Sequence, residues 1–398
     1  MPDLPPQLRL FGDHEEPLGA AEIAAVFDPA RLTQARCLAG MTKAALADRV
    51  GVSAPAVTQW EARSSPPRPD HLRTLSEVLD VPLGFFAAGR PHARLDASTA
   101  HFRSLRSTRS FQRAKAVVFV EQVWELTHAL EKRIALPSVD LPGFVAGEDD
   151  PDHPNIVECQ DIPTDPVAAA GLLRQRWGLG VGPIPHLIRT METRGIVTTM
   201  VPFAGEDTPR IDAFSTSRLP RPLVILTPDR ANDVYWHRFT AAHELGHLLL
   251  HRDSVPGDPM QEQEANQFAA ELLTPAASVK ELLPSRIDFA ALERLGREWG
   301  VSVKSLIYRS RELGALSDAS ARRAYQKLNQ LISVGLLPAQ PVVNYPGEVP
   351  SLLAKAFALA EEHRLLTLVG LARELQWRVP RLRLLLGQVD ERPALRLV

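Results

Sequence analysis

The segment FTAAHELGHLLLH (Phe239–His251) is apolar apart from a few regularly spaced polar residues, and it constrains this chain more than any other. His243 and His247 are four residues apart, slightly more than one helical turn, so both imidazoles leave one face of a helix. Two histidine nitrogens about 2.0–2.1 Å from one ion are what zinc requires of such a pair. Glu244 lies about 100° further round the helix and can reach a zinc-activated water without binding the ion. The pattern predicts a zinc site with Glu244 as general base, whereas two histidines merely packed in a helix are the simpler alternative.

A third protein ligand is needed to leave one open position on a catalytic zinc ion. The following helical segment offers Glu262 and Glu264. Glu262 shares a face with alanines three and seven residues later, which would let this helix approach the first one closely. Glu264 shares its face with the bulky Phe268. We therefore favour Glu262 and leave Glu264 open, and for either one a solvated helix face is the alternative.

A second pattern, LADRVGVSAPAVTQWE (Leu46–Glu61), has the features of two short helices joined by a tight turn. Gly51 permits the turn, and Ser53 is expected to cap the next helix. Val57 and Trp60 lie at the spacing that anchors one helix face in a core. The pattern predicts a helix-turn-helix.

This region resembles the Xre/Cro-type helix-turn-helix family over about residues 29 to 90. The resemblance implies that the second helix of the motif enters the major groove of an operator, and that the protein binds a two-fold site as a homodimer. The alternative is a four-helix scaffold that binds another protein. By position, the resemblance assigns Ser53, Thr58 and Gln59 to bases and Thr42, Lys43 and Arg63 to phosphates.

HELGH followed by E-x-x-A-N-x-F-A-A-E-L-L-x-P resembles the ImmA/IrrE-type metallopeptidases, over about residues 166 to 316. The resemblance implies a Zn²⁺ cofactor, Glu262 as third ligand, and cleavage of a repressor-type regulatory protein. Thr274 stands where the family usually has methionine, a packing change that should not affect chemistry. Tyr235 and His251 are considered as oxyanion donors, but a structural role is favoured for each.

The composition is that of a soluble globular protein, with 45% hydrophobic and 23% charged residues. No stretch of 18 apolar residues and no signal peptide are recognised, so we expect a cytoplasmic protein without membrane contact. The net charge of -2 argues against non-specific coating of nucleic acid, but not against a small DNA-binding module. Cys37 and Cys159 are expected to be reduced thiols.

The expected fold is mostly α-helical, with an all-α helix-turn-helix domain, a small α+β metallopeptidase domain and a helical C-terminal domain. Strands are expected at 196–201, 212–215 and 222–226. The expected boundaries are an arm at 1–28, the helix-turn-helix domain at 29–90, a helical connector and linker at 91–160, the metallopeptidase domain at 161–316 and the C-terminal domain at 317–398.

The segment 365–387 has the rhythm of a second helix-turn-helix pair, but without a capping serine or a glycine turn. Its four arginines, Arg373, Arg378, Arg381 and Arg383, would either contact phosphate or form a solvated face, and the second interpretation is favoured. A ligand-sensing or dimerising module is equally open.

The hypothesis for the whole chain is a DNA-binding transcriptional regulator fused to a zinc-dependent peptidase. One alternative is a transcription factor whose metallopeptidase-like domain senses a metal or ligand, or binds a protein, without cleavage. Another is an interaction module in which both domains are scaffolds.

Overall fold

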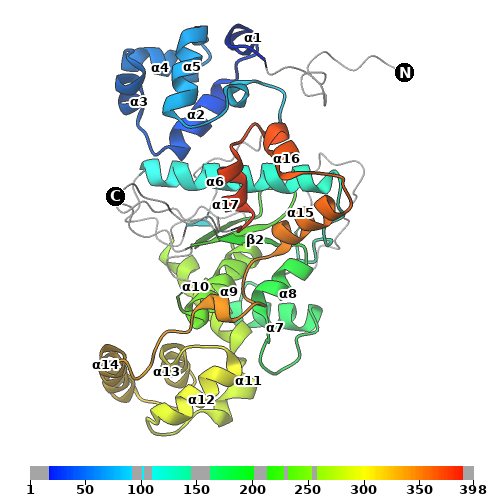
Figure 1. Ribbon diagram of the computed structural model, residues 1–398. Helices are drawn as coiled ribbons and strands as arrows, with labels where there is room; N and C mark the ends of the chain where they lie inside the picture. The colour runs from blue at the N-terminus through cyan, green and yellow to red at the C-terminus, as the bar shows by residue number, and fades with distance from the viewer. Residues whose placement is uncertain are drawn as a thin grey trace, which may run out of the picture. The chain divides into compact units, whose positions relative to one another are not determined.

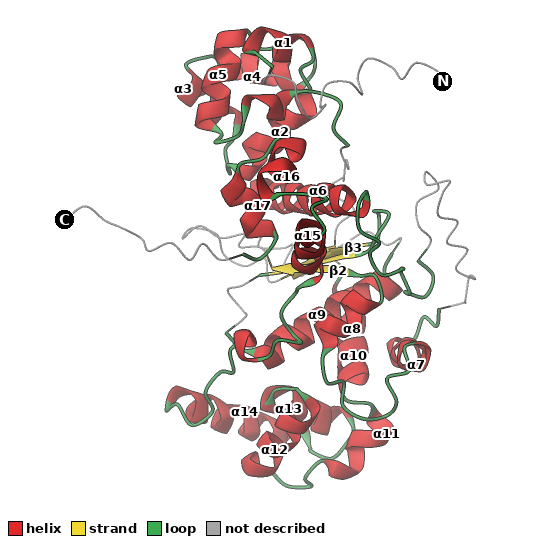
Figure 2. Ribbon diagram, turned by 45° about the vertical axis from the view of Figure 1, so that its right-hand side comes forward, coloured by secondary structure: helices red, strands yellow, loops and turns green. Residues whose placement is uncertain are grey.

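The computed structural model describes residues 18–91, 101–102, 110–144, 162–200, 213–227, 232–252 and 258–388. It confirms a mostly helical chain with one small sheet (Figures 1 and 2). Contacts divide the chain into two compact units. Unit 1 comprises 1–97, 108–136 and 353–398, and unit 2 comprises 98–107 and 137–352. The region expected as one C-terminal domain at 317–398 is thus divided: residues 317–352 belong to unit 2, and the described residues 353–388 belong to unit 1.

Unit 1 is entirely helical in its described residues. The expected arm at 1–28 contains α1, which packs on α5 and η2, so this part of it joins the helical domain. The remaining expected arm, residues 1–17, lies outside the described residues. The elements of unit 1 are α1 (Ala20–Ala25), α2 (Pro29–Leu38), α3 (Lys43–Val50), α4 (Ala54–Glu61), α5 (Pro69–Val78), η2 (Leu83–Phe86), α6 (Ser110–Glu131), α15 (Leu352–Glu362), α16 (Leu368–Leu375) and α17 (Val379–Leu385).

The turn between α3 and α4 forms as expected, with one correction. Gly51 has a φ of 76°, and Val57 is fully buried. Ser53 is the N-cap residue of α4, but its side chain makes no capping hydrogen bond. Pro55 has no N–H to offer, and the Ala56 N–H donates to the backbone oxygen of Ser53. Of the two N–H groups from which an N-cap side chain usually accepts, one is therefore missing and the other is already paired.

Helix α6 is the scaffold of unit 1. It lies within the expected connector at 91–160, and both α2 and α16 pack on it. A buried ion pair joins Arg31 of α2 to Glu125 of α6, and Gln34 donates to Glu125 over 3.1 Å. Because these groups are buried and paired, they fix the helix-turn-helix domain on α6.

Two expectations about single side chains are settled here. Cys37 is a free, buried thiol, while Cys159 lies outside the described residues. Arg381, expected to face solvent or phosphate, instead donates to Gln122 of α6, with 2.7 Å from Nε to the amide oxygen. Its guanidinium also lies 4.2 Å from the ring centre of Phe119. The sequence pattern of α17 does not show that α6 covers this side of the helix.

Unit 2 has a four-stranded sheet with helices. The strand order is β1-β3-β4-β2; β2 is parallel to β4, and the other pairs are antiparallel. The three longer strands lie within two residues of the expected ranges, whereas β1 has only two residues and was not expected. The elements are β1 (His101–Phe102), β2 (Val197–Met200), β3 (Ala213–Thr216), β4 (Leu223–Leu226), α7 (Pro166–Arg176), α8 (Leu187–Thr193), α9 (Val234–Leu250), α10 (Pro259–Leu273), α11 (Ala276–Val279), η5 (Lys280–Leu282), α12 (Phe289–Trp299), α13 (Val303–Glu312), α14 (Asp318–Ser333) and η6 (Val342–Asn344).

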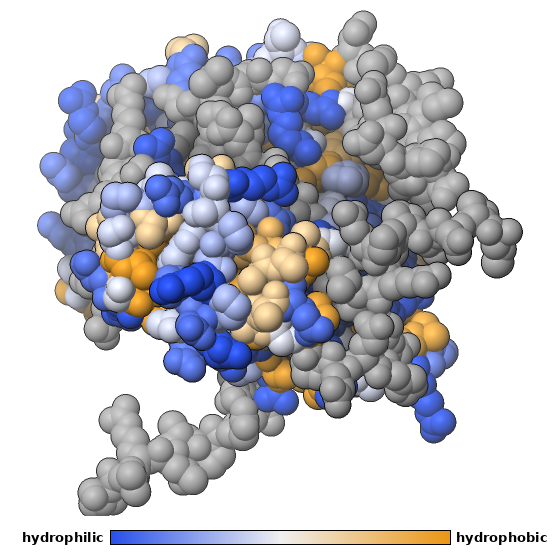
Figure 3. Space-filling view, turned by 90° about the horizontal axis from the view of Figure 1, so that it is seen from above, coloured by the Kyte–Doolittle hydropathy of each residue, from blue (hydrophilic) through white to orange (hydrophobic). Residues whose placement is uncertain are grey.

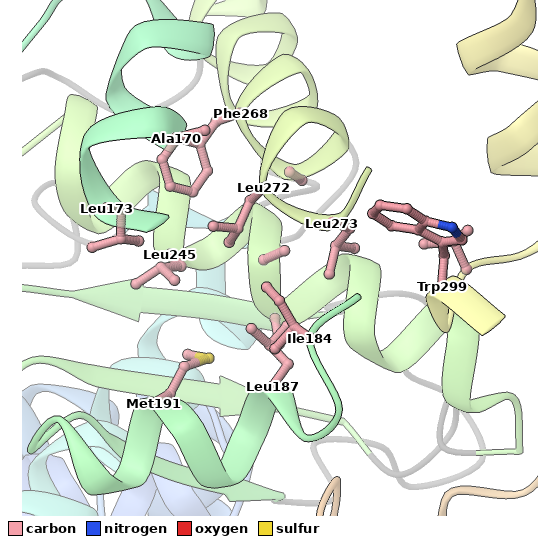
Figure 4. Close-up of a cluster of buried hydrophobic side chains, with 14 of the residues drawn as sticks. Ala170, Leu173, Ile184, Leu187, Met191, Leu245, Phe268, Leu272, Leu273 and Trp299 are labelled. Atoms are coloured by element: carbon pink, nitrogen blue, oxygen red, sulfur yellow. The ribbon is translucent and has the colours of Figure 1, made fainter. Parts of the chain in front are cut away.

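Helix α9 lies at the centre of unit 2. It contacts β3 and β4 on one side and α7, α8 and α10 on others. Figure 4 shows Leu245 of α9 among Leu173 of α7, Met191 of α8 and Phe268 of α10. Most polar side chains on α9 therefore lie in the protein interior and must find hydrogen-bond partners there.

Across the residues that the structure describes, every helix is too short or too polar to cross a membrane.

Candidate metal centre

Helices α9 and α10 approach each other closely because of small residues at their contact. A Cβ atom on Gly246 would lie 3.0 Å from the Phe268 ring and 3.3 Å from the Cα of Ala265. Ala265 and Ala269 are fully buried in this contact. The alanine stripe expected from the sequence is thus the surface through which α10 reaches α9.

His243, His247 and Glu262 come together at this contact. Their three ligand atoms lie within 4.8 Å of one another. The two Nε2 atoms are 3.0 Å apart, and the Glu262 carboxylate oxygens lie 3.4 Å from His243 Nε2 and 3.5 Å from His247 Nε2. Ligand atoms at about 2.0–2.1 Å around a tetrahedral ion are separated by about 3.3 Å. The donor set and its spacing fit a zinc ion and leave a fourth position for another group.

Glu264, the other glutamate that the sequence left open, points elsewhere. Its Oε2 lies 2.8 Å from Nε2 of His251 and so supports that histidine. Of the two glutamates, only Glu262 belongs to the described cluster with His243 and His247.

A chain of hydrogen bonds fixes which nitrogen of His247 faces the cluster. The Glu264 carboxylate can only accept, so His251 donates from Nε2 and its Nδ1 accepts. His251 Nδ1 lies 3.0 Å from Nδ1 of His247, which therefore donates. The lone pair of His247 is then on Nε2, the atom that faces Glu262. This arrangement of partners is typical of histidine ligands.

His243 is oriented in the same way from α10. Its Nδ1 donates to Oδ1 of Asn266 over 3.0 Å, which leaves the lone pair on Nε2. Asn266, His251 and Glu264 are positioning residues that the sequence analysis did not identify as such. The available signal was helical spacing, because Asn266 lies at i+4 from Glu262 and His251 at i+4 from His247, whereas Glu264 at i+2 from Glu262 carries no such signal.

The cluster is buried except on the side of Glu262. His243 and His247 are at most 2% exposed, whereas the side chain of Glu262 is 33% exposed. Burial raises the pKa of Glu262, but in the metal-free state with protons on Nε2 of His243 and His247, hydrogen bonds and positive charge from the two histidines outweigh this effect and lower it to about 2. Burial lowers the pKa of His251, against the opposing effect of Glu264. A carboxylate beside imidazoles is the protonation state that a cation requires.

Glu244, the expected general base, is fully buried and is held by the sheet. The Ser215 hydroxyl on β3 donates to Oε2 of Glu244 over 2.8 Å. This bond fixes the orientation of the Glu244 carboxylate. A lone serine in a short strand carries no spacing signal, so only the packing of β3 against α9 identifies Ser215.

Tyr235 is not brought to the cluster. It lies eight residues before His243 on α9, about 12 Å along the helix axis. Burial raises its pKa, and it hydrogen-bonds with Tyr345. Both observations fit the structural role that the sequence analysis favoured.

The residues expected to contact DNA lie on the surface of α3 and α4. Thr42, Ser53, Thr58, Gln59 and Arg63 are exposed. In the face shown in Figure 3, hydrophilic residues form much of the coloured surface. This surface is suited to polar contacts.

Three of these side chains also have local roles. Thr42 caps α3 by accepting from Ala45 N over 3.1 Å, and Thr58 donates to the Ala54 carbonyl. Lys43, whose side chain is 41% exposed, lies 3.3 Å from Glu61. Only the Lys43 end of this pair is exposed, because the Glu61 side chain is 5% exposed and also pairs with Arg36.

Comparison with known families agrees with both patterns. Residues 191–311, which include the cluster and Ser215, match the family described as IrrE N-terminal-like domain. Residues 32–86 match the family described as Helix-turn-helix. No curated protein matches the chain. The chain thus combines a helix-turn-helix domain with an IrrE N-terminal-like domain of the metallopeptidase type, as the sequence predicts.

Proposed function

We propose that this chain is a DNA-binding regulator whose second unit hydrolyses peptide bonds of a repressor-type regulatory protein with the help of zinc. The observation that carries the proposal is the convergence of two histidine nitrogens and one carboxylate at the spacing of zinc ligands. The helix-turn-helix domain supports the DNA-binding part. We include binding as a homodimer to a two-fold operator in the proposal.

His243, His247 and Glu262 hold the ion in this mechanism. Zinc bound there supplies a Lewis acid that polarises a peptide carbonyl and activates water. Glu244 takes a proton from the attacking water and returns it to the leaving nitrogen. Ser215 keeps the Glu244 carboxylate in place through both transfers.

Two amino-acid substitutions test the peptidase. The purified full chain is loaded with zinc and incubated with a proteome-derived peptide library, and new termini are identified by mass spectrometry. We expect the wild type to cleave, and we expect Glu244→Gln to bind zinc equally but to lose cleavage by about 100-fold or more. Glu281→Gln changes an exposed glutamate of η5 and is the matched control.

The outcomes separate the hypotheses. Cleavage that survives in Glu244→Gln would reject this mechanism. Stoichiometric zinc without any cleavage, in the library or in repressor-type proteins from the same genome, would support a sensing domain instead.

A further inference from the structure

The C-terminal helices α15 to α17 repeat α2 to α4 of the helix-turn-helix domain without a gap. Each position in the second set lies 325 residues after its counterpart in the first. The repeated signals are the cap at Thr42 and Thr367, the turn at Gly51 and Gln376, and the proline at Pro55 and Pro380.

The backbone of the two sets is the same around the turn. Thr367 caps α16 by accepting from Gly370 N over 3.0 Å, as Thr42 caps α3. Gln376 has a φ of 53° in the left-handed region, where Gly51 has 76°. The next N–H, that of Trp377, donates to Ala372 O, as Val52 donates to Ala47 O. The cap and the turn that the sequence of this segment seemed to lack are therefore supplied by Thr367 and Gln376.

The core positions also correspond. Six apolar residues buried in α2 to α4 have counterparts 325 positions later that are also buried, whereas the counterparts of the buried Gln34 and Cys37 are exposed. These pairs are Leu32 and Phe357, Ala35 and Ala360, Leu46 and Leu371, Ala47 and Ala372, Val57 and Leu382, and Trp60 and Leu385.

A left-handed turn between two helices is not sufficient evidence of a repeat, because α12 and α13 are joined by a similar turn. Gly300 is left-handed there, and Ser302 caps α13. However, the N-cap of α12, Asp288, lies twelve residues before Gly300, whereas Thr42 and Thr367 lie nine residues before their turns. Between these two described sets, α15 to α17 match the first set in the spacing of the cap as well as in the turn.

The C-terminal set carries its basic side chains at other positions than the first, which has Lys43, Arg49 and Arg63. Arg373, Arg378 and Arg383 occupy the positions of Asp48, Ser53 and Thr58. Arg373 and Arg378 are exposed and Arg383 is half-buried. Where the first set has an acid and two neutral hydroxyls, the second has three guanidinium groups, which are the side chains that best match phosphate geometry.

We propose that α15 to α17 form a second DNA-contacting module, which binds phosphates of double-stranded DNA through Arg373, Arg378 and Arg383. The inference rests on the DNA binding proposed above. Val379, Pro380 and Leu384 stand where the first module has Ala54, Pro55 and Gln59, and none of their side chains can hydrogen-bond to a base. Arg378 and Arg383 stand where Ser53 and Thr58 of the first module are expected to meet bases. Here they bind phosphates instead, so the module adds affinity without adding sequence preference.

The existing contacts of this module allow such a role. Arg378 pairs with Asp80 over 2.7 Å, but the two side chains are 47% and 83% exposed. A pair so exposed contributes little and can yield to a phosphate. Arg381 takes no part, because it anchors α17 to Gln122 of α6.

The salt dependence of DNA binding tests the proposal in the full chain. The probe is a pool of randomised duplexes, from which bound sequences are also selected. The triple variant Arg373→Gln, Arg378→Gln, Arg383→Gln removes three cations. We expect the slope of log affinity against log salt to become shallower by about 2 to 3, at about 0.9 per phosphate contact, and the selected sequences to stay the same. The matched control is Arg322→Gln, Arg323→Gln, Lys327→Gln, which removes three exposed charges from α14 of unit 2.

A slope equal to that of the control overturns the proposal. If the triple variant does not fold, the exposed Arg373→Gln alone is expected to lower the slope by about 0.9, and an unchanged slope is again decisive against it. Absence of any DNA binding by the wild type contradicts the proposed function as well. A change of selected sequence in Gln59→Ala with an unchanged slope in the arginine variants supports the first module and rejects only the second.

Discussion

The side chains proposed to bind zinc on helices α9 and α10 and those proposed to bind DNA on helices α3 and α4 lie in opposite environments. His243 and His247 are buried, and each is oriented by a partner on another turn or another helix. Gln59 and Arg63 face solvent, and the turn that presents them is set by Thr42 and Gly51 within the same short segment.

The difference follows from the cost of burying polar groups. A buried imidazole must find partners in the protein, whereas an exposed amide or guanidinium can use water. The metal centre therefore depends on the packing of α10 and β3 against α9. The DNA-facing surface depends mainly on local backbone signals.

The largest expected effect is on zinc affinity, and it distinguishes the two glutamates of α10. Glu262→Ala removes a proposed zinc ligand, so zinc affinity should fall well beyond 100-fold. Glu264→Ala removes only the support of His251 and should lower affinity by about 10- to 100-fold. Competition with a chromophoric chelator measures both constants. Equal losses in the two variants would show that Glu262 is not a ligand.

A second effect concerns pH and the interior of unit 2. Burial lowers the pKa of His237 on α9 to about 4, from an ordinary value of 6.5. Below pH 6.5 the unfolded chain binds a proton that the folded chain resists, so folding stability falls as the pH drops towards 4. The full loss is about 3 kcal/mol, at about 1.4 kcal/mol per pKa unit.

Hydrogen exchange of α9 amides at pH 7 and pH 5, corrected for intrinsic rates, measures this loss. His237→Gln can still donate to the Glu348 carbonyl, as His237 Nε2 does over 2.9 Å, but does not titrate. It should therefore remove part of the pH dependence of α9 and leave that of α3 unchanged. An identical pH dependence in variant and wild type would count against a buried, neutral His237.

The smallest effect compares two glycines. Gly246→Val should destabilise the contact of α9 and α10 by about 1–3 kcal/mol through overpacking and also weaken zinc binding. Gly51→Val meets no atom within 4 Å and should cost about 1–2 kcal/mol through left-handed backbone strain alone. Gly51→Asn should recover most of this loss, because asparagine tolerates that conformation. Hydrogen exchange in α3 and α9 separates the effects, and a weaker zinc affinity in Gly51→Val would contradict the comparison.

The order of helices and the three longer strands followed from periodicity and local signals in the sequence. So did the pair His243 and His247, because their spacing is a property of one helix. The N-terminal turn was equally accessible, since Gly51 and Thr42 act within a few residues of themselves. Ser53 was misjudged as a side-chain cap because its neighbours leave it no amide to bind.

Which side chain faces which across two elements was decided only by the tertiary structure. Glu262 and Glu264 differ by two residues, and the approach of α10 through Ala265 to Gly246 determines which one meets the histidines. Ser215, Asn266 and the burial of Arg381 on α6 are consequences of the same kind of packing. Spacing along a chain fixes directions within one helix, but the distance between two helices depends on the side chains that fill the space between them.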